Sequence, residues 1–171
     1  MQPFTNETLQ IEDLPKYEEV NLNSLDSNYW KIIIINIVIT IVIISASALG
    51  IFLLKEESTA YIPHVVAAIL TFAVLLVILF RLSFKRRGIA VRERDIIYSS
   101  GVLSSKTTII PFNRIQHVAL NEGVFSRMYK LGALEVYTAG GASGHIKIYG
   151  LAIDDANRIK ELLSKRLNNA E

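Results

Sequence analysis

The chain contains no cysteine among its 171 residues. A disulfide framework is therefore excluded, and nothing in the sequence requires an oxidising compartment. Charge is missing from two long stretches, residues 32–54 and 58–80, which each run for 23 positions without an acidic or basic side chain. One such run could be the core of a soluble protein, but two in tandem, separated by a short charged segment, argue against that interpretation.

Both runs predict transmembrane helices. At about 1.5 Å per residue, such a run reaches roughly 34 Å as a helix, and a hydrocarbon core is about 30 Å thick. The first run is rich in Ile and Val, but a lone strand in a bilayer leaves its backbone polar groups unpaired, so a helix is favoured. It follows a polar segment without a basic leader, which argues against a cleaved signal peptide. We expect helices over 32–54 and 62–80, joined by a short extracytoplasmic loop over 55–61.

Basic residues predict the orientation of these helices. The connecting segment carries one lysine and two glutamates, whereas four basic residues follow the second helix at once: Arg81, Lys85, Arg86 and Arg87. By the positive-inside rule, both termini then face the cytoplasm, and we expect a multi-pass protein of the cell inner (cytoplasmic) membrane. We expect the four basic side chains to contact the anionic headgroups of the inner leaflet.

The two predicted cytoplasmic segments differ in charge. Residues 1–31 form an acidic arm with a net charge of −4, and residues 81–171 carry a net charge of +7. The arm could dock on the basic segment or remain a solvated tail, and charge runs favour the tail. At the end of the arm, Tyr29, Trp30 and Lys31 are expected to anchor the first helix at the cytoplasmic interface, with Tyr61 on the far side.

From residue 88 onward, the pattern changes to short β-rich runs separated by turn residues. The runs are GIAVRE, DIIYSSGVL, KTTIIPF, RIQHVAL, ALEVYTA and HIKIYG. A final segment, DDANRIKELLSKRL, begins with acidic and ends with basic residues, as the helix dipole favours. Its expected apolar stripe is Ile159, Leu162, Leu163 and Leu167. We predict a small antiparallel sheet of about six strands, closed by one C-terminal amphipathic helix.

Glycines, a serine and a histidine gather in TAGGASGHIKIYG, residues 138–150. A nucleophile elbow needs G-x-S-x-G between a strand and a helix, but Ser143 directly precedes Gly144, with strand-like sequence on both sides. A P-loop needs Gly-Lys at the start of a helix, but His145 follows Gly144. The flanking runs alternate in polarity, so we predict a hairpin whose glycines supply positive φ.

Few other residues suggest chemistry. His64 lies close to a membrane edge, and we interpret it as an interfacial polar residue. Asn36 and Thr40 share one face of the first helix, where their polar side chains could form hydrogen bonds to a neighbouring helix. His117 and His145 are too isolated in the sequence to predict a metal site. Gln116 is expected to share a face with Val118 and Leu120 and to bond backbone across the sheet.

The segment after the second helix resembles the bacterial pleckstrin-homology-like (PH-like) domain of the YdbS type. An ordered set of positions carries the resemblance: Gly101, Pro111, Ile115, Gln116, His117, Val118, Gly123, Arg127, Gly132, Thr138, Gly140 and Ile148 to Leu151. Two preceding transmembrane helices are also typical of the family. The resemblance implies a membrane α-helical hairpin followed by an α+β PH-like domain over residues 81–171, with a small antiparallel β-sheet or partly open barrel closed by one helix.

The resemblance further implies a non-catalytic bacterial membrane protein without a cofactor, in a cell-envelope assembly with a related multi-pass membrane protein. It does not imply phosphoinositide binding, because a fold does not fix a function. Three function classes stay open. A membrane-anchored interaction module is favoured. An enzyme would need a site assembled from scattered residues such as His117, Arg127 and Asp154. Nucleic-acid binding is the third class, but anionic lipid is the simpler partner for basic residues next to a bilayer. Homo-oligomerisation is compatible with each of them.

Overall fold

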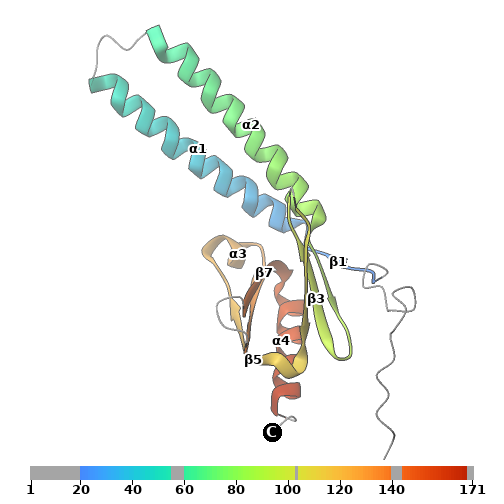
Figure 1. Cartoon of the computed structure of the whole chain (residues 1–171). Coiled ribbons are helices and arrows are strands. Elements are labelled where there is room, and N and C mark those ends of the chain that lie inside the picture. The colour runs from blue at the N-terminus through green and yellow to red at the C-terminus, as the bar shows by residue number, and fades with distance from the viewer. Residues whose placement is uncertain (1–19, 55–59, 103, 140–143, 169–171) are drawn as a thin grey trace, which may run out of the picture.

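The computed structural model describes residues 20–54, 60–102, 104–139 and 144–168. Two long helices, α1 (Asn28–Leu54) and α2 (Ile62–Arg86), form a hairpin that projects from a smaller α+β domain (Figure 1). Both helices are long and apolar enough to cross a membrane. The predicted spans lie inside them, and the segment 55–59 of the predicted connecting loop lies outside the described residues.

Each helix extends beyond its apolar run on the side of the domain. The backbone N–H of Asn28 donates to Oδ1 of Asp26 at 2.7 Å, which caps α1 four residues before the apolar run begins. The first turn of α2 contains Pro63, and its last turn contains Lys85 and Arg86. The basic segment expected to begin the domain is therefore largely the end of the second helix.

Within the described residues, seven strands form two antiparallel sheets, one of four strands in the order β1-β2-β3-β4 and one of three in the order β5-β6-β7. The first sheet comprises β1 (Asn23–Ser24), β2 (Gly88–Val91), β3 (Asp95–Ser100) and β4 (Lys106–Pro111). The second comprises β5 (Ile115–Asn121), β6 (Leu131–Thr138) and β7 (His145–Ala152). A short 3-10 helix, η4 (Phe112–Arg114), leads from one sheet to the other.

The expected fold class is confirmed, with an antiparallel domain that does not close into a barrel. Two details of the prediction were wrong. The strands divide between two sheets, because η4 turns the chain out of the first sheet after β4. A seventh strand, β1, comes from the N-terminal arm, and its two polar residues, Asn23 and Ser24, are too few to show a strand period.

Residues 20–27 of the arm pack on the domain, so the prediction of a solvated tail was wrong for this part. Asn23 and Ser24 pair with β2 of the domain, and Leu25 is buried in the hydrophobic core. The backbone N–H of Asp26 donates to the carbonyl of Gly150 in β7 at 2.9 Å. The arm therefore connects the two sheets immediately before α1 begins. Residues 1–19 lie outside the described residues.

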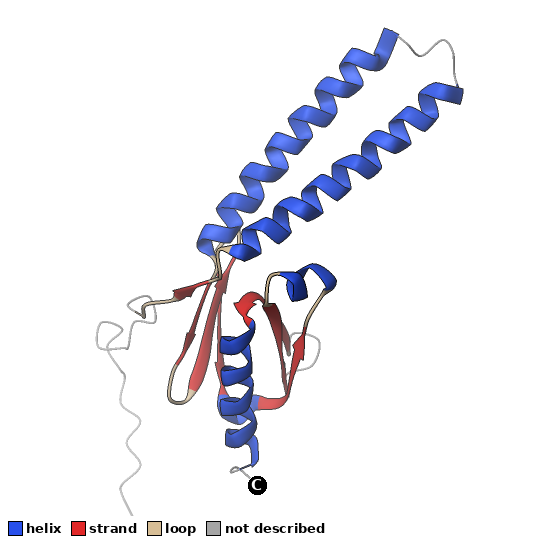
Figure 2. Cartoon of the chain, turned by 180° about the vertical axis from the view of Figure 1, so that it is seen from behind, coloured by secondary structure: helices blue, strands red, loops and turns tan. Residues whose placement is uncertain are grey.

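Helix α4 (Ile153–Asn168) packs beside both sheets and completes the core (Figure 2). Its acidic first turn and basic last turn are as predicted. The buried stripe differs by one residue, since Leu162 is exposed and Ala156 is fully buried in its place. Gly132 of β6 lets the helix approach closely, because a Cβ there would lie 2.8 Å from Cδ1 of Leu120 and 3.3 Å from Cδ1 of Ile153.

Strands β6 and β7 form the predicted hairpin. Leu134 pairs with Ile148, and Val136 pairs with Ile146, which places these apolar side chains on the core face. The glycine turn itself, residues 140–143 with Gly140 and Ser143, lies outside the described residues. The prediction for Gln116 was wrong: a β-bulge between Ile115 and His117 shifts the register, and Gln116 is exposed on the surface.

A short helix, α3 (Val124–Met128), precedes β6 and was not predicted. Both views place it beside the start of α1, at the end of the domain that carries the hairpin (Figures 1 and 2). Five residues are too few for a hydrophobic period to appear in the sequence.

Candidate functional site

Aromatic side chains join the helical hairpin to the domain. The ring centroid of Phe84 in α2 lies 6.3 Å from that of Tyr29 and 6.1 Å from that of Trp30, both in the first turn of α1. Tyr29 also lies directly over Gly150 of β7, where a Cβ would come within 2.5 Å of its ring. Tyr29 and Trp30, expected only as membrane anchors, therefore fix the base of the hairpin to the domain.

The four basic residues at the end of α2 do not form one exposed cluster. The guanidinium of Arg81 lies 4.8 Å from the centroid of the Trp30 ring, a cation–π contact. Arg86 donates to the carbonyl of Val102 in the domain. Arg87 is half-buried and donates to the hydroxyl of Tyr29 at 3.4 Å. Only Lys85 is exposed without such a contact among the described residues, so three of the four basic residues support the junction.

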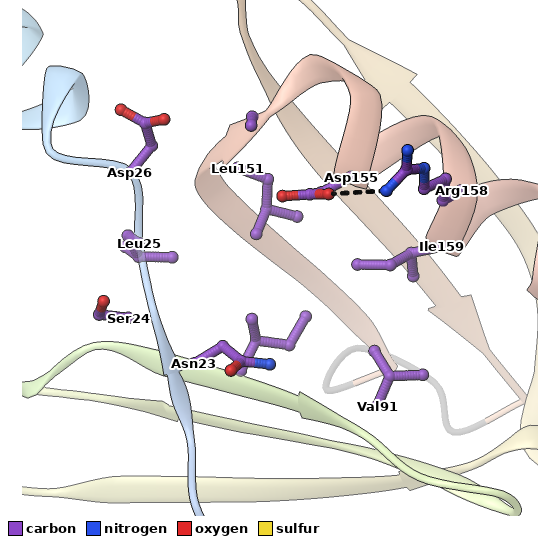
Figure 3. A pocket seen from close by; sticks show the side chains of 11 residues that line it. Asn23, Ser24, Leu25, Asp26, Val91, Leu151, Asp155, Arg158 and Ile159 are labelled. Carbon is purple, nitrogen blue, oxygen red and sulfur yellow. Dashed lines mark ion pairs between the residues drawn. The ribbon is translucent and has the colours of Figure 1, made fainter.

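A cleft of about 590 Å³ opens between the two sheets on the side of the arm (Figure 3). Residues of β1 line one wall, and α4 supplies Asp155, Arg158 and Ile159 opposite them. The floor includes apolar side chains of both sheets, such as Ile89 and Leu151. The cleft therefore lies where β1 and β7 end their sheets, and the Asp26–Gly150 backbone hydrogen bond spans this seam next to the hairpin.

A second polar feature lies on the outer face of the three-stranded sheet. Glu135 of β6 has a side chain that is only 11% exposed, and its Oε1 lies 2.5 Å from Nζ of Lys147 on β7. Its Oε2 accepts a hydrogen bond from the hydroxyl of Tyr137 at 2.8 Å, and Asn121 of β5 donates to Oε1 at 3.4 Å. The carboxylate is thus surrounded by donors from all three strands.

These donors stabilise the ionised form of Glu135. The hydrogen bond from Lys147, followed by the one from Tyr137, lowers the pKa of the carboxyl from 4.5 to about 2. The same contact raises the pKa of Lys147. A general acid or base at neutral pH needs a pKa near the working pH, so the cluster is arranged as a structural network across the strands.

Acidification is expected to destabilise the domain through Glu135. Because its folded pKa lies below its ordinary value, the contribution is present above pH 4.5 and is lost as the pH falls toward 2. We expect Glu135→Gln to lower the free energy of unfolding by about 1–3 kcal/mol at pH 7 and to flatten its decrease in acid. Denaturant titrations across this pH range measure both effects. Glu122→Gln, at an exposed position, is the matched control, and an equal effect of the two variants would contradict the network.

The two histidines of the domain are closer than the sequence suggested. The Tyr137 ring stacks on His145 with centroids 4.4 Å apart, and His117 lies 5.7 Å from Tyr137 on its other side. Pairing of three strands brings them together, which linear spacing does not show. Within the described residues, no group of three or more His, Asp or Glu side chains is placed to hold a metal ion.

The positions that carry the family resemblance serve mainly the fold. Ile115 and Val118 are buried in the core, and Gly132 lies against α4. The backbone N–H of Thr138 donates to the carbonyl of Gly144 at 2.7 Å beside the turn. The exposed positions among those described include Pro111 at the end of β4, Gln116, His117, Gly123, Arg127 on α3 and Tyr149. Across the described residues, no hydrogen bond or ion pair joins His117, Arg127 and Asp154, the scattered set that an enzyme would need.

Polar residues of the hairpin have local roles. The hydroxyl of Thr40 donates to the carbonyl of Asn36 within α1 at 2.8 Å, and both residues line the space between the two helices with Phe72 and Phe80. The predicted bond between helices is therefore replaced by one within α1. His64 lies in the first turn of α2 and is exposed.

A docked arm, two long apolar helices and an antiparallel domain closed by one helix follow one another along the chain, and a known family matches this whole arrangement. The bacterial PH domain family model matches residues 19–167, which include the docked arm, both helices and the whole domain. The chain belongs to the bacterial PH domain family. Among curated proteins, it is similar to the UPF0699 transmembrane protein YdbS of Bacillus subtilis (strain 168), with 31% identity over 75 residues. That match covers 44% of this chain and 45% of the relative. No solved structure matches the chain.

The bacterial PH domain is here part of a transmembrane protein, as the similarity to YdbS and the two long apolar helices show. The match begins at residue 19, so the docked part of the arm belongs to the family's common region. The YdbS-type resemblance is confirmed. The matched region spans less than half of the relative's length, and the relative's name describes a transmembrane protein without stating an activity.

Proposed function

We propose that this protein is a non-catalytic interaction module of a bacterial cell-envelope assembly, with both termini on the cytoplasmic side of the cell membrane. The cleft between β1 and α4 carries this proposal, because it combines apolar walls with the ends of two sheets (Figure 3). An extended segment of a partner can add backbone hydrogen bonds at a sheet edge and place alternate side chains in apolar pockets. The partner that fits best is a related multi-pass membrane protein, since the cleft lies on a domain fixed to the membrane hairpin.

Rigid attachment supports the same function. The aromatic contacts between α1 and α2, the buried Leu25 and the backbone bond from Asp26 to Gly150 hold the domain to the base of the hairpin. A domain held in this way presents one fixed surface to a neighbour in the membrane. Preorganisation of this kind reduces the entropy cost of binding.

Photo-crosslinking in native membranes tests the interaction. A photo-reactive amino acid at Arg158, whose side chain is exposed at the cleft, is expected to capture a multi-pass membrane protein of the same family. Lys106, exposed at the start of β4 on the other edge of the four-stranded sheet, is the matched control position. Equal capture from both positions, or none from Arg158, would contradict a partner in the cleft. Capture of a second copy of the chain would assign the cleft to self-association instead.

Fewer basic residues are free to contact lipid headgroups than the sequence predicted. Lys85 is the exposed member of the set, and Arg81 lies over Trp30 near the start of α1. Each basic residue near an anionic surface contributes on the order of 1 kcal/mol, and salt weakens this attraction. Arg87 belongs to the junction and is not expected to contact headgroups.

Replacing Lys85 with Gln is expected to weaken the attraction of the domain to anionic bilayers by about 1 kcal/mol. Proteolysis of the domain in vesicles should then be faster than for the wild type when phosphatidylglycerol is present, and the same when phosphatidylcholine alone is used. Lys165→Gln, an exposed position in the last turn of α4 at the end of the domain away from the hairpin (Figure 1), is the control. Identical proteolysis of the Lys85 variant and the wild type in both lipids would leave this residue as a signal for membrane orientation only.

A further inference from the structure

Helix α3 exposes two apolar side chains to an unusual degree. Val124 is 79% exposed and Met128 is 73% exposed, whereas the next most exposed large apolar side chain among the described residues of the domain is Ile109 at 43%. Val124 and Met128 are four positions apart in α3 and therefore lie on one face of it. Single exposed apolar residues are common on proteins, so the location of this pair decides its meaning.

Helix α3, with Val124 and Met128, lies at the level where the chain enters the membrane. Tyr129, directly after α3, lies under the ammonium of Lys31, with 5.7 Å from Nζ to the ring centroid. Lys31 is the last charged residue before the apolar run of α1. Both views show α3 beside this end of α1 and not at the far end of the domain (Figures 1 and 2). The polar headgroup region adds about 5–8 Å on each side of the hydrocarbon core, so α3 lies at the depth of the headgroups.

The charges around α3 suit a lipid surface. Arg127 is exposed within the helix, and Lys130 is exposed just after it. Long basic side chains place their charge among phosphates while their methylene stems cover apolar surface. Apolar residues flanked by basic ones are typical of elements that lie in the interface of a membrane.

We propose that α3 is a lipid-contact element, in which Val124 and Met128 enter the boundary between headgroups and acyl chains of the leaflet where α1 begins. The domain is then held to the bilayer at three places, α1, α2 and α3, which fixes its tilt. This inference needs only that α1 spans a membrane. It holds whichever side of the membrane the domain faces and whatever partner occupies the cleft.

Fluorescent labelling tests the contact, because the chain has no native cysteine. The full chain with Val124→Cys or Met128→Cys is labelled with an environment-sensitive dye and placed, one copy per disc, in nanodiscs of phosphatidylcholine and phosphatidylglycerol. The control is Asn113→Cys, an exposed position in η4, which lies at the end of the domain away from the hairpin (Figure 1). We expect blue-shifted emission and quenching by lipids with a spin label near the headgroup for the two α3 positions, and iodide quenching alone for Asn113.

Two results would overturn the proposal. Full iodide quenching without lipid quenching at both α3 positions would place them in water. Protection from both quenchers would show that protein covers them. The nanodiscs hold a single copy and no partner, so failure here leaves crosslinking from the cleft unaffected, and failure of that crosslinking leaves this lipid contact unaffected.

Discussion

Replacing Gly150 with alanine is expected to lower the free energy of unfolding by about 2–5 kcal/mol. Gly150 has a φ of +77°, a conformation that costs a residue with a side chain about 1–2 kcal/mol. A Cβ at this position would also lie 2.5, 2.6 and 2.9 Å from three atoms of Tyr29, and overpacking of a fitted contact costs about 1–3 kcal/mol. Because the ring of Tyr29 is rigid and belongs to α1, the clash would act directly between the hairpin and the domain.

The chain contains a built-in reporter for this effect. Trp30 is its single tryptophan, and it lies at the same junction against Phe84 and Arg81. Denaturant titration of the detergent-solubilised protein, followed by Trp30 fluorescence, therefore measures the stability of the junction. Gly123→Ala is the matched control, since Gly123 has a φ of −69° and its nearest contact would be Oγ of Ser126 at 3.7 Å.

A double-mutant cycle separates the two causes. If the clash with Tyr29 contributes, Gly150→Ala should cost less in a Tyr29→Ala background than in the wild type, and the remainder reports the backbone conformation. Equal stability of the Gly150 and Gly123 variants would show that the hairpin and the domain are not packed through this contact.

Replacing Leu25 with alanine is expected to destabilise the domain by about 2–5 kcal/mol, the range for removal of a leucine from a packed core. Leu25 is 5% exposed and belongs to the same cluster as Ile89, Leu151 and Leu163. The residue precedes α1, although most of that core comes after α2. We therefore expect the domain to lose stability through a change that lies outside the segment 81–171.

The control for Leu25 is Leu22→Ala in the same segment. Leu22 is 38% exposed, and its truncation should cost about 1 kcal/mol or less. Thermal unfolding measured by circular dichroism on the detergent-solubilised protein compares the two variants. If Leu25→Ala is as stable as Leu22→Ala, the arm does not contribute to the core of the domain in solution.

Much of this fold follows from local patterns in the sequence. The two membrane helices were predictable from their long uncharged apolar runs, and the β6–β7 hairpin and α4 were predictable from a clear hydrophobic period. Leu134, Val136 and Ile148 occupy the core face that their alternation indicates. The dipole pattern of Asp154 and Asp155 against Lys165 and Arg166 located the ends of α4 well.

The candidate site was predictable only in small part, because it depends on contacts between distant segments. Tyr29 and Gly150 are 121 positions apart in the chain, and neither residue alone indicates the other. Strand β1 is two residues long, so its pairing arises from the core position of Leu25 and not from a local preference. Similarly, Gln116 is exposed instead of facing inward with Val118, because a β-bulge lies between Ile115 and His117. A bulge depends on pairing with the neighbouring strand, so the alternation of residues along β5 alone does not reveal it.

The orientation of the domain is tested most directly by thiol labelling in intact cells. The cysteine-free chain allows one probe at a time, with Tyr61→Cys at the start of α2 and Glu161→Cys on the exposed side of α4. We predict that a membrane-impermeant thiol reagent labels position 61 in intact cells and labels position 161 only after the membrane is permeabilised. Labelling of position 161 in intact cells, with position 61 protected, would place the domain outside the cytoplasm and contradict the proposed function.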